Sequence, residues 1–179
     1  MKKIKKMGKR SDFERKPRDF YPTPFAAVEP LINHLQPGKF KFSEPCAGDG
    51  QLCRHLEYFG GLCMWASDIE PQLAGIAKND FTEIGDFHVL ESDYIITNPP
   101  WDRSVLHPMI DHFSLLRPTW LLFDADWPHT KQSSDYMKKC SKIVSVGRIK
   151  WFGNMTGKDN CAWYLFENKE METKFYGRT

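Results

Sequence analysis

Short apolar runs alternate with stretches of helical spacing from residue 24 to residue 166, and this alternation restricts the fold more than any other feature of the chain. Strands that alternate with helices form a mostly parallel sheet with helices on both faces. We therefore expect a single α/β domain over residues 19–179, with a seven-stranded sheet. The spacing predicts helices over 24–35, 51–59, 70–78, 105–116 and 133–139, and strands over 40–43, 62–67, 81–85, 94–97, 120–123, 143–151 and 162–166.

The last two predicted strands are joined by residues 153–160, which include two glycines, two asparagines and Lys158. This composition is typical of a hairpin loop, so we expect the two strands to be antiparallel and to close one edge of the sheet. The loop either reaches over a bound nucleic acid or is a plain surface turn. In open α/β sheets, ligands bind outside the carboxyl ends of the strands, so functional residues are expected there.

The first eighteen residues form a strongly basic segment, with nine Lys or Arg against Asp12 and Glu14. The whole chain has a net charge of only +2, so the remainder is mildly acidic. A basic arm on an acidic body suits a protein that binds nucleic acid, because the arm releases counterions from phosphates. A solvated, flexible tail with no such role fits the composition equally well.

The cysteines and the apolar segments exclude several classes of protein. The five cysteines are odd in number and contain no C-x-x-C pair, which argues against a disulfide scaffold and a zinc site; we expect no metal. No segment approaches the ~20 apolar residues of a membrane helix. The polar stretch 11–18 stands where a signal peptide would be apolar, so we expect a cytoplasmic protein. For its oligomeric state we expect a monomer or a homodimer.

A glycine turn lies between the first predicted strand and the helix that follows it, in Ala47-Gly48-Asp49-Gly50. Glycine lets a ligand approach the backbone closely because it has no Cβ atom. A dinucleotide fingerprint would require a third glycine where Cys53 stands, and the Gly-Lys-Ser/Thr ending of a phosphate-binding loop is absent. Asp68, at the end of the second predicted strand, can accept hydrogen bonds from both ribose hydroxyls, or it can cap a helix.

The segment Asn98-Pro99-Pro100-Trp101 follows the fourth predicted strand directly. Its two prolines end the strand and have no N–H donors, so the Asn98 side chain and the Pro99 carbonyl are presented as acceptors. Trp101 adds a flat aromatic face. Two acceptors beside a stacking ring suit the exocyclic amino group of a planar base, whereas the alternative is a proline-rich turn with a buried tryptophan.

These residues resemble a known family. The segment 44–50, Glu-Pro-Cys-Ala-Gly-Asp-Gly, is similar to the cofactor motif of class I S-adenosylmethionine-dependent methyltransferases. Residues 98–101 resemble the catalytic motif of the amino-group methyltransferases, chiefly DNA N6-adenine enzymes, and Tyr21-Pro-Thr-Pro24 resembles the N-terminal cofactor motif. The order of the motifs is that of the gamma arrangement. The resemblance implies a Rossmann-like methyltransferase fold, S-adenosyl-L-methionine as cofactor, and methyl transfer to adenine N6 in DNA.

The resemblance also assigns roles to residues. Thr23 would lie near the methionine carboxylate of the cofactor, Glu44 and Ala47-Gly48 around its methionine part, and Asp68 on its ribose. In Asp86-Phe87, the carboxylate would accept from the cofactor adenine and the ring would lie against it. Catalytic contacts are implied for Asn98, Pro99, Pro100 and Trp101, and cofactor contacts for Tyr21, Thr23, Pro24, Glu44, Pro45, Ala47, Gly48, Gly50, Asp68, Ile69, Asp86, Phe87 and Asn98.

The chain departs from the family in two respects. Trp101 stands where Tyr or Phe is commoner, which keeps a stacking ring. Fewer than 80 residues follow Trp101, whereas gamma-type enzymes usually carry a separate target-recognition domain there. We therefore expect low sequence specificity, as in small stand-alone methyltransferases of bacteriophages and mobile elements. The alternatives are an amino-group methyltransferase acting on RNA adenine or a protein glutamine amide, a cofactor-binding protein without turnover, and a nucleic-acid binding module.

Overall fold

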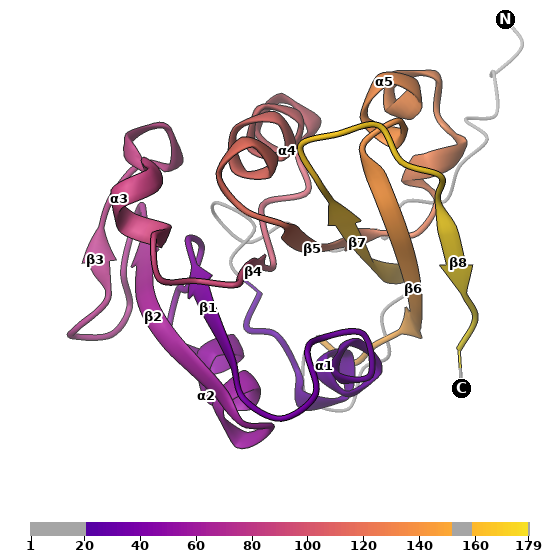
Figure 1. The fold of residues 1–179 in the computed structure, drawn as a ribbon. Helices are drawn as coiled ribbons and strands as arrows, with labels where there is room; N and C mark the ends of the chain where they lie inside the picture. Colours follow the sequence, from indigo (N-terminus) through magenta and orange to yellow (C-terminus); the bar gives the residue numbers. More distant parts are fainter. Residues whose placement is uncertain (1–20, 152–158, 179) are drawn as a thin grey trace, which may run out of the picture.

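A computed structural model describes residues 21–151 and 159–178 (Figure 1). The basic segment 1–18 lies outside the described residues, as does most of the predicted hairpin loop, including Lys158. The helices are α1 (Phe25–Ile32), α2 (Gln51–Tyr58), α3 (Asp86–Val89), α4 (Arg103–Leu116) and α5 (Ser134–Met137), with 3-10 turns η2 (Phe81–Glu83), η3 (Trp127–His129) and η4 (Lys131–Ser133). The strands are β1 (Phe40–Glu44), β2 (Gly61–Asp68), β3 (Ala77–Lys78), β4 (Tyr94–Thr97), β5 (Thr119–Asp124), β6 (Cys140–Arg148), β7 (Asn160–Phe166) and β8 (Lys174–Tyr176).

The strands form one sheet in the order β3-β2-β1-β4-β5-β7-β6-β8. β7 runs antiparallel to both of its neighbours, and every other pairing in the sheet is parallel. The predicted mostly parallel sheet with an antiparallel pair is therefore confirmed. The pair does not close the edge, because β8 adds an eighth strand that the sequence did not predict.

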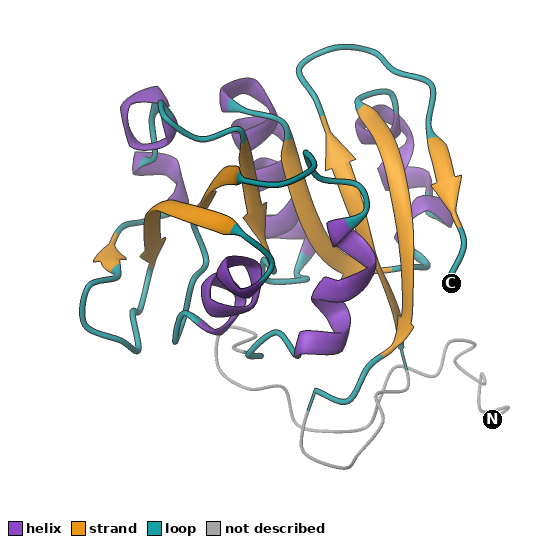
Figure 2. Ribbon diagram, turned by 60° about the horizontal axis from the view of Figure 1, so that its bottom comes forward, coloured by secondary structure: helices purple, strands orange, loops and turns teal. Residues whose placement is uncertain are grey.

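Helices cover both faces of the sheet (Figure 2). On one face, α1 and α2 pack Val28, Leu31 and Leu56 against Phe42 and Trp163 of the strands, all less than 1% exposed. On the other face, Leu106 and Ile110 of α4 belong to a second apolar cluster, which contains Phe123, Tyr164 and Phe166 of the strands and Trp127 of η3. A sheet buried on both faces explains why its strands read as continuous apolar runs.

Two predicted elements between β2 and β4 are wrong. The expected helix over 70–78 is a loop that crosses the glycine turn and ends in β3, and the Gln72 amide donates to the Gly48 carbonyl at 2.9 Å. Pro71 lacks a donor and Gly75 takes a φ of 93°, which interrupts a helix. The expected strand over 81–85 is the 3-10 turn η2, capped by the Asp80 carboxylate.

No helix within the described part of the chain has the length and apolar character required to cross a membrane.

Candidate active site

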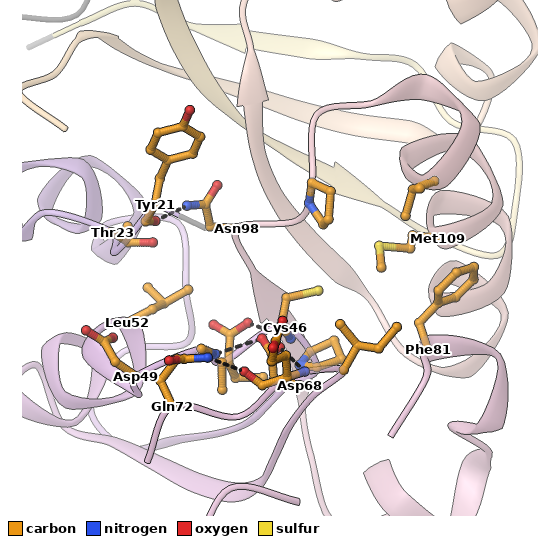
Figure 3. A pocket seen from close by; sticks show the side chains of 18 of the residues that line it. Tyr21, Thr23, Cys46, Asp49, Leu52, Asp68, Gln72, Phe81, Asn98 and Met109 are labelled. Atoms are coloured by element: carbon orange, nitrogen blue, oxygen red, sulfur yellow. Dashed lines mark hydrogen bonds between the residues drawn. The ribbon is translucent and has the colours of Figure 1, made fainter. Parts of the chain in front are cut away.

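A cavity of about 570 Å³ opens at the carboxyl ends of β1, β2 and β4 (Figure 3). Its volume lies in the usual range of small-molecule sites, about 300–1,000 Å³. Among the residues with predicted cofactor or catalytic roles, those lining the cavity are Tyr21, Thr23, Glu44, Pro45, Ala47, Gly48, Asp68, Ile69, Asn98 and Pro100. The topology therefore brings together residues that are up to 79 positions apart in the sequence.

Three other predicted residues adjoin lining residues in the sequence but do not themselves line the cavity. Pro24 and Gly50 are the N-cap residues of α1 and α2, and Pro99 is buried in the turn after β4. The wall also contains residues that the sequence did not single out, namely Leu52, Asp80, Phe81, Val105 and Met109. These have no local motif and are recognisable only from their place in the fold.

The glycine turn after β1 is tied to the end of β2. Gly48 and Gly50 take φ values of 53° and 74°, which residues with a Cβ atom rarely adopt. The Gly48 amide donates to the Asp68 carboxylate at 2.8 Å, and the Ala47 amide donates to the Ser67 carbonyl at 2.8 Å. The turn is thus held open toward the cavity, with no side chain on Gly48 to fill it.

The Asp68 carboxylate is fixed by two backbone amides. Oδ2 accepts from Gly48 and Oδ1 accepts from Glu70, each at 2.8 Å. A carboxylate has about four lone-pair sites, so two acceptor sites are left for a ligand. Asp68 is half-buried on the cavity wall and can accept from two neighbouring hydroxyls.

Glu44 is the last residue of β1 and is fully buried on the cavity wall. Its Oε1 accepts from the Cys46 amide at 3.2 Å, whereas its Oε2 has no hydrogen-bond partner within residues 21–151 and 159–178. Burial raises the pKa of the Glu44 carboxyl well above its usual value of 4.5. A cationic donor entering the cavity would satisfy the orphaned oxygen.

Asp86 and Phe87 are not brought to the cavity. Asp86 forms an ion pair with Arg117 at 2.7 Å on the surface, and Phe87 is 87% exposed. The same Asp-Phe dipeptide occurs six residues earlier, just after β3, and there Asp80 and Phe81 line the cavity. The sequence-based assignment followed from the wrong strand over 81–85; the repeated dipeptide was the signal that could have corrected it.

Asn98 is oriented by the segment that precedes α1. Its side-chain nitrogen donates to the backbone carbonyl of Tyr21 at 3.0 Å, which fixes the amide orientation (Figure 3). The Asn98 Oδ1 atom is consequently left as the acceptor. Trp101 is half-buried, does not line the cavity, and donates from its indole nitrogen to the Leu122 carbonyl of β5 at 3.2 Å.

A third aromatic ring joins Tyr21 and Trp101. Trp151, which follows β6, has its ring centroid 6.3 Å from Tyr21 and 5.9 Å from Trp101, both in edge-to-face geometry. The sequence predicted Trp151 only as the end of a strand, because it lies fifty residues beyond Trp101. The three rings form one aromatic group, which is linked to Asn98 through the backbone of Tyr21.

No group of three or more His, Cys, Asp or Glu side chains in the described ranges is arranged to hold a metal ion.

No protein-family model and no curated protein sequence matches this chain. It is similar to several solved structures at low identity. A putative RNA methyltransferase from Pyrococcus horikoshii is 14% identical, with a TM-score of 0.60 over 87% of this chain and 89% of that one. A putative class I S-adenosylmethionine-dependent methyltransferase from Listeria monocytogenes is 11% identical, with a TM-score of 0.54 over 85% of this chain and 62% of that one.

A modification subunit of a putative type I restriction enzyme from Vibrio vulnificus is 14% identical, with a TM-score of 0.52. The match covers 89% of this chain and 47% of that one, so this chain spans about half of that subunit. Together with the strand order, the single antiparallel strand β7 and the glycine turn after β1, these likenesses show that the chain has the Rossmann-like fold of the class I methyltransferases.

Proposed function

We propose that this chain transfers a methyl group from S-adenosyl-L-methionine to the exocyclic N6 amino group of adenine in DNA. The observation that carries the proposal is the position of Asn98. Its amide is held by the Tyr21 carbonyl on the cavity wall, and the Tyr21 ring belongs to a group of three aromatic rings with Trp101 and Trp151. The geometry offers an acceptor and flat apolar surfaces, which is what an amino group on a planar base requires.

The cavity fits S-adenosyl-L-methionine, the cofactor that the fold implies. The orphaned Glu44 Oε2 atom would accept from the methionine ammonium group, and the free lone pairs of Asp68 would accept from the two ribose hydroxyls. Phe81 and Met109 supply apolar surface for the adenine ring, and Asp80 supplies an acceptor near it. These residues come from β1, β2, the turn η2 with its cap, and α4.

The chemistry depends on the acceptor nitrogen. The cofactor, when bound, supplies an electrophilic methyl group on a sulfonium. The lone pair of an adenine amino group is delocalised into the ring, so the protein must favour its localised form. Asn98 Oδ1 and the Pro99 carbonyl would accept the two N–H hydrogens and stabilise the positive charge that develops on nitrogen. No general base is needed before attack, because the proton leaves the far more acidic product ammonium.

The aromatic rings would hold the target base. In a duplex the base must be flipped out of the stack, which costs a few kcal/mol. Stacking on an aromatic side chain is worth about 1–3 kcal/mol per base and offsets that cost. Trp101 is anchored to β5 through its indole nitrogen, so its ring is pre-oriented for this role.

Product analysis tests the proposal. The full chain would be incubated with methyl-labelled S-adenosyl-L-methionine and, separately, with unmethylated duplex DNA, single-stranded DNA and RNA. Digestion to nucleosides and mass spectrometry then identify the product, and Asn98→Ala serves as the inactive control. N6-methyldeoxyadenosine is expected from DNA. Label in RNA alone, or in a protein glutamine, would move the chain to another class of substrate.

A further inference from the structure

A group of three cations lies at the carboxyl ends of β6 and β8. Arg148 is the last residue of β6, Lys150 follows it, and Arg178 comes two residues after β8. All three are exposed. Because β6 and β8 are parallel, with Val144 paired to Tyr176, their carboxyl ends meet at one edge of the sheet.

Gly147 lets Arg178 approach the end of β6. Gly147 has a φ of 82° at an irregularity in β6, and a Cβ atom there would lie 3.2 Å from Arg178 Nη1 and 3.5 Å from its Cδ. The guanidinium of Arg178 therefore lies over the β6 backbone, in space that only glycine leaves. The fold thus holds the Arg178 guanidinium against the β6 backbone one residue before Arg148.

These three side chains form no ion pair with the described part of the chain. The ion pairs found within residues 21–151 and 159–178 involve other cations, and no hydrogen bond from the Arg148, Lys150 or Arg178 side chain is found there. Adjacent like charges repel each other, so their placement favours binding of an anion.

The three cations are connected to the proposed base site. From Gly147 to Trp151 the chain spans four residues, which is at most about 14 Å. Trp151 in turn lies 5.9 Å from Trp101. A DNA strand rises about 3.4 Å per nucleotide along the helix axis, so a strand with its base beside Trp101 would pass the cations within a few nucleotides.

Protection of the sheet edge does not account for these residues. Lysines on an edge strand often block pairing with another chain. Arg148, however, pairs with Asn160 of β7 and lies four residues beyond the end of the β8 pairing at Val144, and Arg178 folds inward over Gly147 of β6.

We propose that Arg148, Lys150 and Arg178 form a phosphate-binding surface for the DNA strand that presents the target base. This inference rests on the proposed function and adds where the backbone of the substrate is held. The occupant is a polyanion with regularly spaced phosphates, which matches three cations along one edge.

The test compares two charge-matched double variants of the full chain. Arg148→Ala/Arg178→Ala removes two cations from the surface, and Lys169→Ala/Lys174→Ala removes two exposed cations from before and at the start of β8. Fluorescence anisotropy measures binding of a labelled DNA duplex across a salt series. Each lost phosphate contact lowers the log–log salt slope by about 0.9, so the first variant should lose nearly two units and the second should keep the wild-type slope.

Three further measurements keep the result interpretable. Thermal unfolding checks that both variants fold. Arg148→Lys/Arg178→Lys should retain the slope, because phosphate contact needs the charge. Single-stranded DNA and RNA of equal length are run in parallel; a slope change confined to RNA would overturn DNA as the occupant.

Failure of this inference is distinguishable from failure of the proposed function. A wild-type chain that methylates DNA, with an unchanged slope in Arg148→Ala/Arg178→Ala, overturns the surface and leaves the function standing. If the wild-type chain makes no methylated nucleoside, but the salt slope of DNA binding falls only in Arg148→Ala/Arg178→Ala, the phosphate-binding surface stands and the proposed function is overturned. Equal losses in both double variants, or no binding of DNA by the wild type, also overturn the surface.

Discussion

The side-chain nitrogen of Asn98 donates a hydrogen bond to the backbone carbonyl of Tyr21 over 3.0 Å, although the two residues are 77 positions apart. The contact joins the turn after β4 to the segment before α1. The contact fixes the orientation of the Asn98 amide, so that its Oδ1 atom is left as an acceptor on the cavity wall.

Asn98→Ala is expected to abolish methyl transfer while largely sparing cofactor binding. Removing one group that stabilises developing charge typically lowers the rate by about 10²–10³-fold. Single-turnover rates on DNA and calorimetric binding of S-adenosyl-L-methionine would be measured on the same preparation. Asn33→Ala, at the exposed end of α1, is the control. Near-normal turnover in Asn98→Ala would place the active site elsewhere.

Phe81→Ala is expected to weaken cofactor binding by about 2–13-fold, since an aromatic contact is worth about 0.5–1.5 kcal/mol. Phe87→Ala is the matched control, because its ring is 87% exposed and away from the cavity. Calorimetry with S-adenosyl-L-methionine compares the two, and thermal unfolding accounts for the packing of Phe81 on Phe113. A larger loss in Phe87→Ala would restore the original assignment from the sequence.

The raised pKa of the Glu44 carboxyl should make the stability of the fold depend on pH. Its pKa is raised above 4.5 in the folded chain, so the folded state binds more protons than the unfolded state. The stabilisation by this group is full below about pH 4.5 and is lost as the pH rises through the folded pKa. The melting temperature without cofactor should therefore fall less with rising pH in Glu44→Gln than in the wild type. Glu57→Gln, on the exposed face of α2, should behave like the wild type.

Binding of S-adenosyl-L-methionine should release a proton from Glu44, because an ammonium group favours the charged carboxylate. Calorimetry in two buffers of different ionisation enthalpy measures this release. Glu44→Gln should bind more weakly and release fewer protons. Equal proton release in Glu44→Gln and the wild type would show that Glu44 does not contact the cofactor's charge.

Trp151→Ala is expected to lower kcat/KM for DNA by about tenfold or more, on the scale of one lost base stack, with cofactor affinity unchanged. Trp151→Phe should recover most of the loss, because it keeps a ring beside Tyr21 and Trp101. Steady-state kinetics on a DNA oligonucleotide give the comparison. A variant that loses activity and cofactor binding together would instead indicate a structural role.

The sequence by itself determined the elements whose signals are local. β4 has the predicted bounds, and β1, β2, β5 and α4 lie within two residues of theirs, because continuous apolar runs and helical spacing are properties of short segments. The glycine turn and the Asn98–Trp101 segment were identifiable for the same reason. Proline and glycine restrict or free the backbone wherever they stand.

The tertiary structure alone decided the contacts between distant segments. β3 is two residues long and gains its pairing from β2, so no periodicity marks it, and the fold places Asp80-Phe81 rather than Asp86-Phe87 on the cavity wall. Trp151 meets Trp101 only because β4 and β6, which β5 and β7 separate in the sheet, run in the same direction and end on the same side of it. The raised pKa of Glu44 and the approach of Arg178 to Gly147 likewise follow from burial and close packing, which the whole fold sets and no short stretch of sequence encodes.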